Sequence, residues 1–383
     1  CLIRLKYILN IKSGDGINND LIDSENCYPV FGGNGIIGYS NVYNNNDTIL
    51  IIGRVGAKCG NVRLATGKKW VTDNALIVNA IGNKKHLVYL LESMDLNQLA
   101  SKNAQPLITS TIIKEQKIYY PTKVEQTKIA NFLDKKTAHI DKKIELLEQK
   151  IIKYQELKKT LINETVCRGL DKSVELKDSG IEWIREIPQN WKFIRIKDVF
   201  IERNQKGFPD EPLLIASQDK GVILKNDYNR NTMSVTKDFH NLKFVDKNDF
   251  VISLRSFEGG LELAYYRGII SPAYTVIHLK FPDDYNHYYF KHLFKSVDFV
   301  FMLNRCTTGI REGRNINYSQ LKNEFVPVPP KYEQTAIANY LDEKCEKIDT
   351  IIQSIKQEIE LLKEFRKTLI NDVVTGKIKV PDA

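Results

Sequence analysis

The chain has 383 residues, which is longer than one hydrophobic core usually supports, so two or more domains are expected. Its composition, 42% hydrophobic and 27% charged, is typical of a folded globular protein, and no apolar run approaches the ~18 residues of a membrane-spanning helix. The net charge of +9 permits an anionic partner such as DNA but does not by itself indicate one.

The first residues, Cys1-Leu2-Ile3-Arg4, have neither the pattern of a signal peptide nor an initiator methionine. We therefore expect a cytoplasmic protein that lacks a few N-terminal residues. The six cysteines are scattered, without the paired spacing or the neighbouring histidines that organise zinc. We expect reduced thiols and no bound metal.

Residues 1–124 are predicted to form a mixed α/β domain. β-Branched runs at 48–52 and 76–78 indicate buried strands, and a helical pattern follows at 86–99. The glycine-rich stretch at 31–38 lacks the Lys-Ser/Thr pair and the strand–loop–helix setting of a nucleotide-binding loop. It predicts tight turns.

Residues 125–166 are predicted to form one long helix, because apolar residues recur in steps of three and four and no proline or glycine interrupts them. The residues of this apolar seam are Ile140, Ile144, Leu147, Ile151, Tyr154 and Leu161.

A polar link is expected at 167–190, and it ends in Ile187-Pro188 shortly before Trp191. A second mixed α/β domain should then occupy 191–332. Its predicted strands lie at 249–253 and 274–279, and its helical pattern lies at 288–303.

A second long helix is predicted at 333–375, followed by a short tail at 376–383. Each helix would be roughly 60 Å long at about 1.5 Å per residue, so it needs a partner helix along its narrow apolar seam. We expect the two helices to pair as an antiparallel coiled coil; a generic helical bundle and an intermolecular dimerisation zipper are the alternatives. The second seam contains Ile348, Ile352, Ile355, Ile359, Leu362 and Leu369.

The two long helices are copies of each other. The segment from Glu125 to Asp134 recurs from Glu333 to Asp342, an offset of 208 (333 minus 125), with eight of ten positions identical. The same offset aligns Lys159-Thr-Leu-Ile-Asn163 with 367–371 and Pro121 with Pro329. A weaker sequence similarity relates residues 3–6 to residues 194–197. The chain is therefore an internal duplication.

The repeated segment resembles a signature of type I restriction-modification specificity subunits. In that family, the pattern P-P-x-x-E-Q-x-x-I-A-x-(F/Y)-L-D opens each conserved helical region, and it is complete from Pro329 to Asp342. The first copy has Pro121-Thr122 in place of the double proline. Ser179-Gly-Ile-Glu-Trp183 with the following Ile187-Pro188 is also similar, so the resemblance covers essentially the whole chain.

The resemblance implies that residues 1–124 and 191–332 are target recognition domains, each reading half of a split DNA sequence, while the helices separate them. It implies two modification subunits as partners and, through them, restriction subunits. S-Adenosylmethionine, ATP and magnesium would be ligands of those partners, with no cofactor on this chain.

Arg and Lys favour guanine, Asn and Gln favour adenine, and basic side chains also bind phosphates, so polar loops are the candidates for DNA contact. Gly309-Ile-Arg-Glu-Gly-Arg314 is the strongest candidate, because glycines let the backbone approach DNA. Any one candidate could instead be a solvated surface group, and Arg54 and Arg255 could be structural. The candidates are Arg54, Lys58, Asn61, Arg63, Lys68, Lys69, Lys102, Asn103, Gln105, Lys225, Asn229, Arg230, Asn231, Arg255, Arg311, Arg314 and Asn315.

Catalytic motifs are missing from the sequence. The Pro329-Pro330 pair is followed by Lys331, so it is not the Asn/Asp-Pro-Pro-aromatic motif of DNA amino-methyltransferases, and Gly376-Lys377 lacks the rest of a Walker A motif. We expect a non-catalytic, sequence-specific DNA-binding subunit. The alternatives are a coiled-coil adaptor that binds protein and the DNA-reading part of a fused restriction enzyme.

Overall fold

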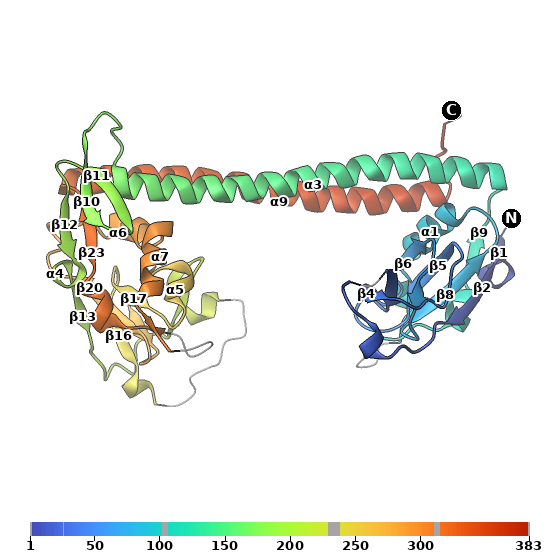
Figure 1. Ribbon diagram of the computed structural model, residues 1–383, viewed down its shortest axis with the longest axis horizontal. Helices are drawn as coiled ribbons and strands as arrows, with labels where there is room; N and C mark the ends of the chain where they lie inside the picture. Colours follow the sequence, from blue (N-terminus) through green and yellow to red (C-terminus); the bar gives the residue numbers. More distant parts are fainter. Residues whose placement is uncertain (1, 26, 102–105, 229–237, 310–314, 382–383) are drawn as a thin grey trace. The chain divides into compact units, whose positions relative to one another are not determined.

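The computed structural model describes residues 2–25, 27–101, 106–228, 238–309 and 315–381. The chain divides into two compact units: Cys1–Glu148 with Ile355–Ala383, and Gln149–Ser354 (Figure 1). Two long helices, α3 (Lys123–Arg168) and α9 (Lys331–Val374), contribute a stretch to both units. Each unit therefore contains one mixed α/β domain and its own part of the helix pair.

The first unit is built on an antiparallel sheet of order β2-β8-β5-β6. All of β5 is buried, because apolar residues of α1 cover one face of the sheet, and a second sheet of order β4-β3-β7 and the pair β1-β9 complete the domain. The elements are β1 (Leu2–Arg4), η1 (Leu5–Tyr7), β2 (Leu9–Ser13), η2 (Asn19–Leu21), β3 (Tyr28–Gly32), β4 (Gly35–Ser40), β5 (Ile49–Gly53), β6 (Val62–Ala65), β7 (Trp70–Val71), β8 (Ala75–Ala80), α1 (Lys84–Ser93), η3 (Leu96–Leu99), α2 (Ser110–Lys114) and β9 (Lys117–Tyr119).

The second unit repeats this plan with a sheet of order β13-β20-β17-β18, also antiparallel. Smaller pairs surround it, and α6 and α7 contribute aromatic residues to its core. The elements are β10 (Leu176–Ile181), β11 (Ile184–Pro188), β12 (Lys192–Arg195), α4 (Ile196–Val199), β13 (Phe200–Arg203), β14 (Leu214–Ser217), β15 (Gly221–Leu224), η4 (Lys225–Asp227), η5 (Phe239–Asn241), β16 (Lys243–Val245), β17 (Phe250–Ile252), α5 (Ser256–Gly259), β18 (Glu262–Leu263), β19 (Gly268–Ile270), β20 (Thr275–Leu279), α6 (His287–Leu293), α7 (Val297–Arg305), β21 (Thr307–Thr308), β22 (Asn315–Ile316), α8 (Tyr318–Leu321) and β23 (Phe325–Val328).

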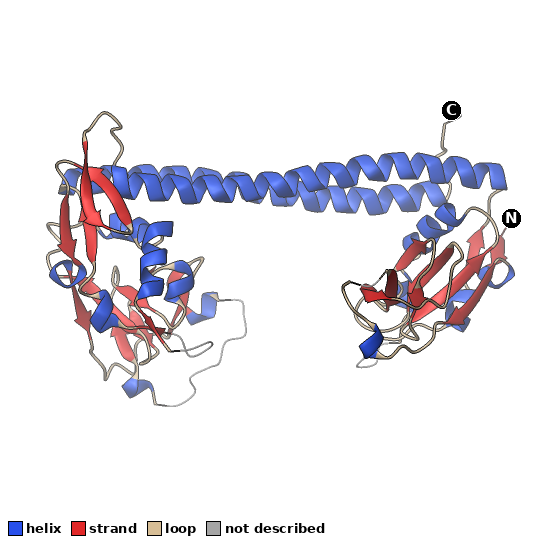
Figure 2. Cartoon of the chain, viewed as in Figure 1, coloured by secondary structure: helices blue, strands red, loops and turns tan. Residues whose placement is uncertain are grey.

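The duplication extends into the domains, although their sequences differ. Ile3 of β1 pairs with Ile118, and Ile194 of β12 pairs with Val326, so the two strand partners are again 208 residues apart (326 minus 118). The glycine-rich stretch at 31–38 forms the turn of the β3–β4 hairpin, as predicted. Figure 2 shows strands and short helices in both domains, whereas α3 and α9 are helical throughout.

The expected polar link at 167–190 is instead part of the second unit's core. Strands β10 and β11 pair as a hairpin, and Trp183, Ile184 and Ile187 are buried beside Val166 of α3. Arg185 and Glu186 are exposed between the buried Ile184 and Ile187, so the composition of the segment looks polar although its apolar residues are buried.

The helices α3 and α9 run antiparallel in each unit. In the first unit, Arg366 Nε donates to Asp141 Oδ1 at 2.9 Å, and Lys143 Nζ lies 2.8 Å from Glu358 Oε1. In the second unit, Lys158 Nζ lies 2.6 Å from Asp349 Oδ2. Residue numbers rise along one helix as they fall along the other, so the predicted antiparallel pairing within one chain is confirmed.

The apolar seam on α9 is more deeply buried than the seam on α3. Ile348, Ile352, Ile355 and Ile359 are 5–8% exposed, whereas most of the α3 seam is half-buried. The difference means that side chains of α9 form more of the water-excluded contact between the two helices.

Among the helices of the described residues, none combines the length and the apolar composition of a membrane span.

Ile352→Ala should lower the free energy of unfolding by about 2–3 kcal/mol, because it leaves a cavity in the helix pair. Its neighbour provides a matched control, since Ile351 is 38% exposed and Ile352 is 8% exposed. Ile351→Ala should cost less than about 1 kcal/mol. Urea denaturation followed by circular dichroism measures both, and equal losses would contradict the assigned seam.

Candidate DNA interface

Four loops of the first domain meet at the end of the sheet where β5 finishes. Gly53 packs so closely on the β3–β4 turn that a Cβ atom there would lie 2.0 Å from Gly33 O. Arg54 N donates to Asn74 O at 2.9 Å, and Gly56 N donates to Pro106 O at 3.0 Å. We call this region, residues 32–35, 53–61, 72–75 and 106–108, the first loop cluster.

The first loop cluster brings together four of the predicted DNA-contacting residues. Lys58, Asn61 and Arg63 are exposed around it, with Arg63 Nη2 donating to Asn34 O at 3.3 Å. Arg54 is half-buried, and its Nη1 donates to Ser13 Oγ at 3.3 Å and Asp73 O at 3.4 Å. Arg54 therefore has a structural role in the first loop cluster.

Lys69 is not a DNA-contacting residue, contrary to the sequence-based prediction. Its side chain is fully buried, and Nζ donates to Asp47 O at 2.6 Å. Burial lowers the pKa of Lys69, opposed by the charge of Asp47. The adjacent Lys68 is exposed, but it lies beyond the other end of β6, over the rings of Tyr28 and Tyr43. Neither lysine belongs to the first loop cluster.

Lys102, Asn103 and Gln105 lie outside the described residues. The residues on both sides of them are anchored at the first loop cluster: Ser101 N donates to Leu107 O at 3.0 Å, and Ile108 N donates to Arg54 O at 2.9 Å.

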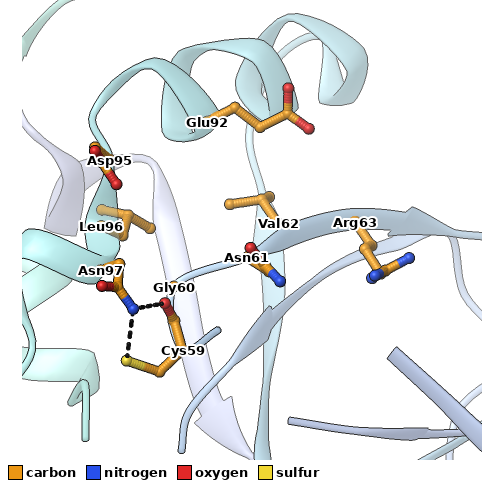
Figure 3. A pocket seen from close by; sticks show the side chains of 9 residues that line it. All are labelled: Cys59, Gly60, Asn61, Val62, Arg63, Glu92, Asp95, Leu96 and Asn97. Atoms are coloured by element: carbon orange, nitrogen blue, oxygen red, sulfur yellow. Dashed lines mark hydrogen bonds between the residues drawn. The ribbon is translucent and has the colours of Figure 1, made fainter. Parts of the chain in front are cut away.

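A small polar pocket opens next to the first loop cluster (Figure 3). Its volume is about 380 Å³, and its lining includes Asn61 and Arg63 at the start of β6 and Glu92 and Asp95 of the α1–η3 region. Burial raises the pKa of Glu92, and the nearby Arg366 opposes that shift. No cluster of three metal-binding side chains exists among the described residues.

The second domain has a related loop cluster, formed by residues 217–220 and 253–260 at the end of β17. Gln218 Nε2 donates to Arg255 O at 3.3 Å, and the Arg255 side chain is exposed. A Cβ atom on Gly260, whose φ is +83°, would lie 1.9 Å from Phe294 O, so only glycine allows this turn to pack on the helical layer.

The other candidates of the second domain are distributed as follows. Exposed Asn315 lies on β22, beside α5, and its Oδ1 accepts from Thr308 Oγ1 at 3.1 Å. Lys225 follows β15 at the end of its hairpin away from Arg255, so the structure does not bring these two together. Five further candidates lie outside the described residues: Asn229, Arg230, Asn231, Arg311 and Arg314.

All twelve predicted helix-pairing residues are buried or half-buried. The buried ones are Ile140, Ile348, Ile352, Ile355, Ile359 and Leu369, and the half-buried ones are Ile144, Leu147, Ile151, Tyr154, Leu161 and Leu362.

Sequence reasoning missed the polar residues that attach each domain to its helices. Gln126 and Gln334 are each 1% exposed and occupy equivalent positions in the two repeats. Their identity at the 208-residue offset was the available signal.

Comparison with known proteins agrees with this architecture. The family model for the type I restriction modification DNA specificity domain matches residues 2–154 and 188–361. The chain therefore belongs to this family. It is 37% identical over 137 residues to the type I restriction enzyme EcoprrI specificity subunit of Escherichia coli, a match that covers 34% of each chain.

One more distant relative and one solved structure match over most of their length. A putative type I restriction enzyme MjaX specificity subunit of Methanocaldococcus jannaschii is 25% identical over 328 residues, or 80% of this chain and 72% of that subunit. A chain solved in work on complex assembly and conformational transition of the type I R-M system has a TM-score of 0.70 at 12% identity and covers 99% of this chain and 98% of its own. That likeness supports the fold.

Lys58→Ala should weaken binding to duplex DNA and lower the slope of log affinity against log salt by about one, because one phosphate contact is lost. Lys68→Ala is the matched control, since it removes an exposed lysine at the other end of β6. Fluorescence anisotropy over a range of salt concentrations measures both slopes. Equal slopes for the two variants would exclude the first loop cluster as a phosphate-binding surface.

Proposed function

We propose that this chain is the DNA-specificity subunit of a type I restriction-modification enzyme. It recognises a bipartite DNA target with two domains and provides the scaffold for the methyltransferase and restriction subunits. One observation carries the proposal: two domains with the same strand order are each packed on part of a duplicated, antiparallel helix pair. The family membership supports it independently.

The division into a constant frame and variable loops suits sequence reading. The sheets of the two domains share one plan, whereas the residues around Arg54 and Arg255 differ in type and in loop length. Loops on a rigid sheet can change their base contacts without changing the fold. Two such domains in one chain would read two separated half-sites on DNA.

The helix pair also offers surfaces to protein partners. Leu146, Ile152 and Leu157 of α3 are each more than half exposed, at 52–54%, so apolar side chains of the helix pair remain accessible to a partner. We propose that two modification subunits bind to the repeated helices and nearby domain faces, and that restriction subunits assemble through them. A duplicated scaffold can bind two copies of one partner in the same way.

We propose that this chain itself carries no catalytic site. Methyl transfer and DNA cleavage would take place in the partner subunits, which would bind S-adenosylmethionine, ATP and magnesium. The sequence supports this assignment, because it has neither the amino-methyltransferase motif nor a Walker A motif. The proposed site of action is the bacterial cytoplasm, where such an enzyme meets DNA.

Co-expression of the chain with its cognate modification subunit should produce adenine methylation at a split motif with a fixed spacer. Exchange of residues 191–331 for the corresponding region of a related subunit should change one half of the motif only. Long-read sequencing of the host genome measures both results. A stable complex that gives no sequence-dependent methylation would indicate an adaptor that binds protein, and failure to form a complex would contradict the proposal.

A further inference from the structure

Each copy of the repeated helix presents a buried glutamine to the domain beside it. Gln126 Oε1 accepts from Asn83 N at 2.9 Å, while its Nε2 donates to Pro121 O at 2.9 Å. Gln334 repeats both contacts, with Asn286 N and Pro329 O, at 2.8 Å each. One side-chain amide thus binds the start of a domain helix and the end of the chain that leads into the long helix.

The threonine that follows each glutamine binds the same domain residue. Asn83 Nδ2 donates to Thr127 Oγ1 at 3.3 Å, and Asn286 Nδ2 donates to Thr335 Oγ1 at 3.1 Å. Both asparagines also cap domain helices, since the Asn83 side chain accepts from His86 N and the Asn286 side chain accepts from Tyr288 N. The first turns of α1 and α6 are therefore bonded directly to α3 and α9.

An aspartate two turns further along the helix supplies a third contact. Asp134 accepts from Lys85 Nζ at 2.5 Å and from Tyr89 Oη at 2.8 Å. Its repeat, Asp342, is bonded to Lys291 Nζ at 2.6 Å and lies 2.8 Å from His292 Nε2. Burial alone would raise the pKa of Asp342, but these partners outweigh burial and lower it to about 2.

The helix side of this attachment is constant, whereas the domain side varies. Gln, Thr and Asp are identical in both repeats, but the donors to the aspartates are Lys85 and Tyr89 in one domain and Lys291 and His292 in the other. The capping asparagines are 203 residues apart (286 minus 83), not 208, so the stretch between the asparagine and the glutamine is five residues longer in the second domain. The two helices therefore present the same hydrogen-bonding residues to two domains of different sequence.

Directional bonds at three points fix an orientation that apolar packing alone does not specify. The glutamine and the aspartate are eight residues apart (134 minus 126), or about 12 Å along the helix axis. Contacts at both ends of that length resist rotation and sliding of the domain on its helices, because hydrogen bonds are lost when donor and acceptor shift by about an ångström.

We infer that Gln126, Thr127 and Asp134, with their repeats Gln334, Thr335 and Asp342, are positioning residues for DNA recognition. They fix the orientation of each domain on its helix pair and thereby restrict the spacer length that the chain accepts between two half-sites. The inference rests on the proposed function, and it assigns spacer discrimination to residues that do not contact DNA.

The test compares Asp134→Ala with the wild-type chain, each co-expressed with the modification subunit. Genome sequencing gives the ratio of methylation at sites with the cognate spacer to methylation at sites one base pair longer or shorter. The ratio should fall roughly fivefold in the variant, because the loss of charge-assisted bonds frees the domain to rotate. Asp134→Asn should restore part of the ratio, since an amide oxygen still accepts from Tyr89.

Asp349→Ala is the matched control. It also removes a carboxylate bonded to a lysine, but Asp349 joins α9 to Lys158 of α3 and touches no domain through that bond. It should leave the spacer ratio unchanged. A purely structural role for Asp134 would lower methylation equally at all spacers and leave the ratio at the control value, which would overturn the inference.

Two further outcomes are separable. If the wild-type chain gives no bipartite methylation, the proposed function itself fails. If Asp134→Ala does not fold, as judged by thermal unfolding, Thr127→Val decides the matter, because it replaces the hydroxyl that accepts from Asn83 Nδ2 with a methyl group of similar size. A lower spacer ratio in Thr127→Val supports the inference, and an unchanged ratio overturns it.

Discussion

The antiparallel pairing of two copies of one helix is the constraint on which the rest of the structure depends. Equivalent residues exchange roles between the units: Leu133 of α3 and Ile370 of α9 lie in the first core, and their repeats, Leu341 of α9 and Ile162 of α3, lie in the second. Only an antiparallel pair brings the start of one copy beside the end of the other. Each domain core therefore requires both helices, and neither helix serves only one domain.

This arrangement separates the part of the chain that must stay constant from the part that can change. Helix contacts are made by repeated residues, so a mutation there alters the attachment of a domain. Close backbone packing at glycines and backbone hydrogen bonds fix the loop clusters. The side chains of Lys58 and Arg255 are exposed and do not pack in the core. New recognition properties can arise in those loops at little cost to stability, because exposed loop positions tolerate substitution.

The sequence predicts the fold wherever a periodic pattern is long or repeated. The helix seams and the central strands β5 and β17 follow from such patterns. The hairpin at 176–188 was missed because charged and polar residues outnumber its buried apolar residues, so the sequence shows no apolar run there. Lys69 was predicted to contact DNA because the sequence does not distinguish it from its exposed neighbour Lys68. The fold buries the side chain of Lys69. For the candidate site, the sequence indicates residue types that can contact DNA, but only the folded loops show which of these residues lie on one surface.

The first unit is discontinuous in sequence, and this affects the order in which the protein can be completed during synthesis. Its core includes Leu369, Ile370, Val373 and Val374, near the end of the chain, whereas all of the second unit lies within 149–354. The ribosome can therefore release every residue of the second unit before the first has its full core. A premature stop near residue 360 would damage the domain made first and leave the later one intact.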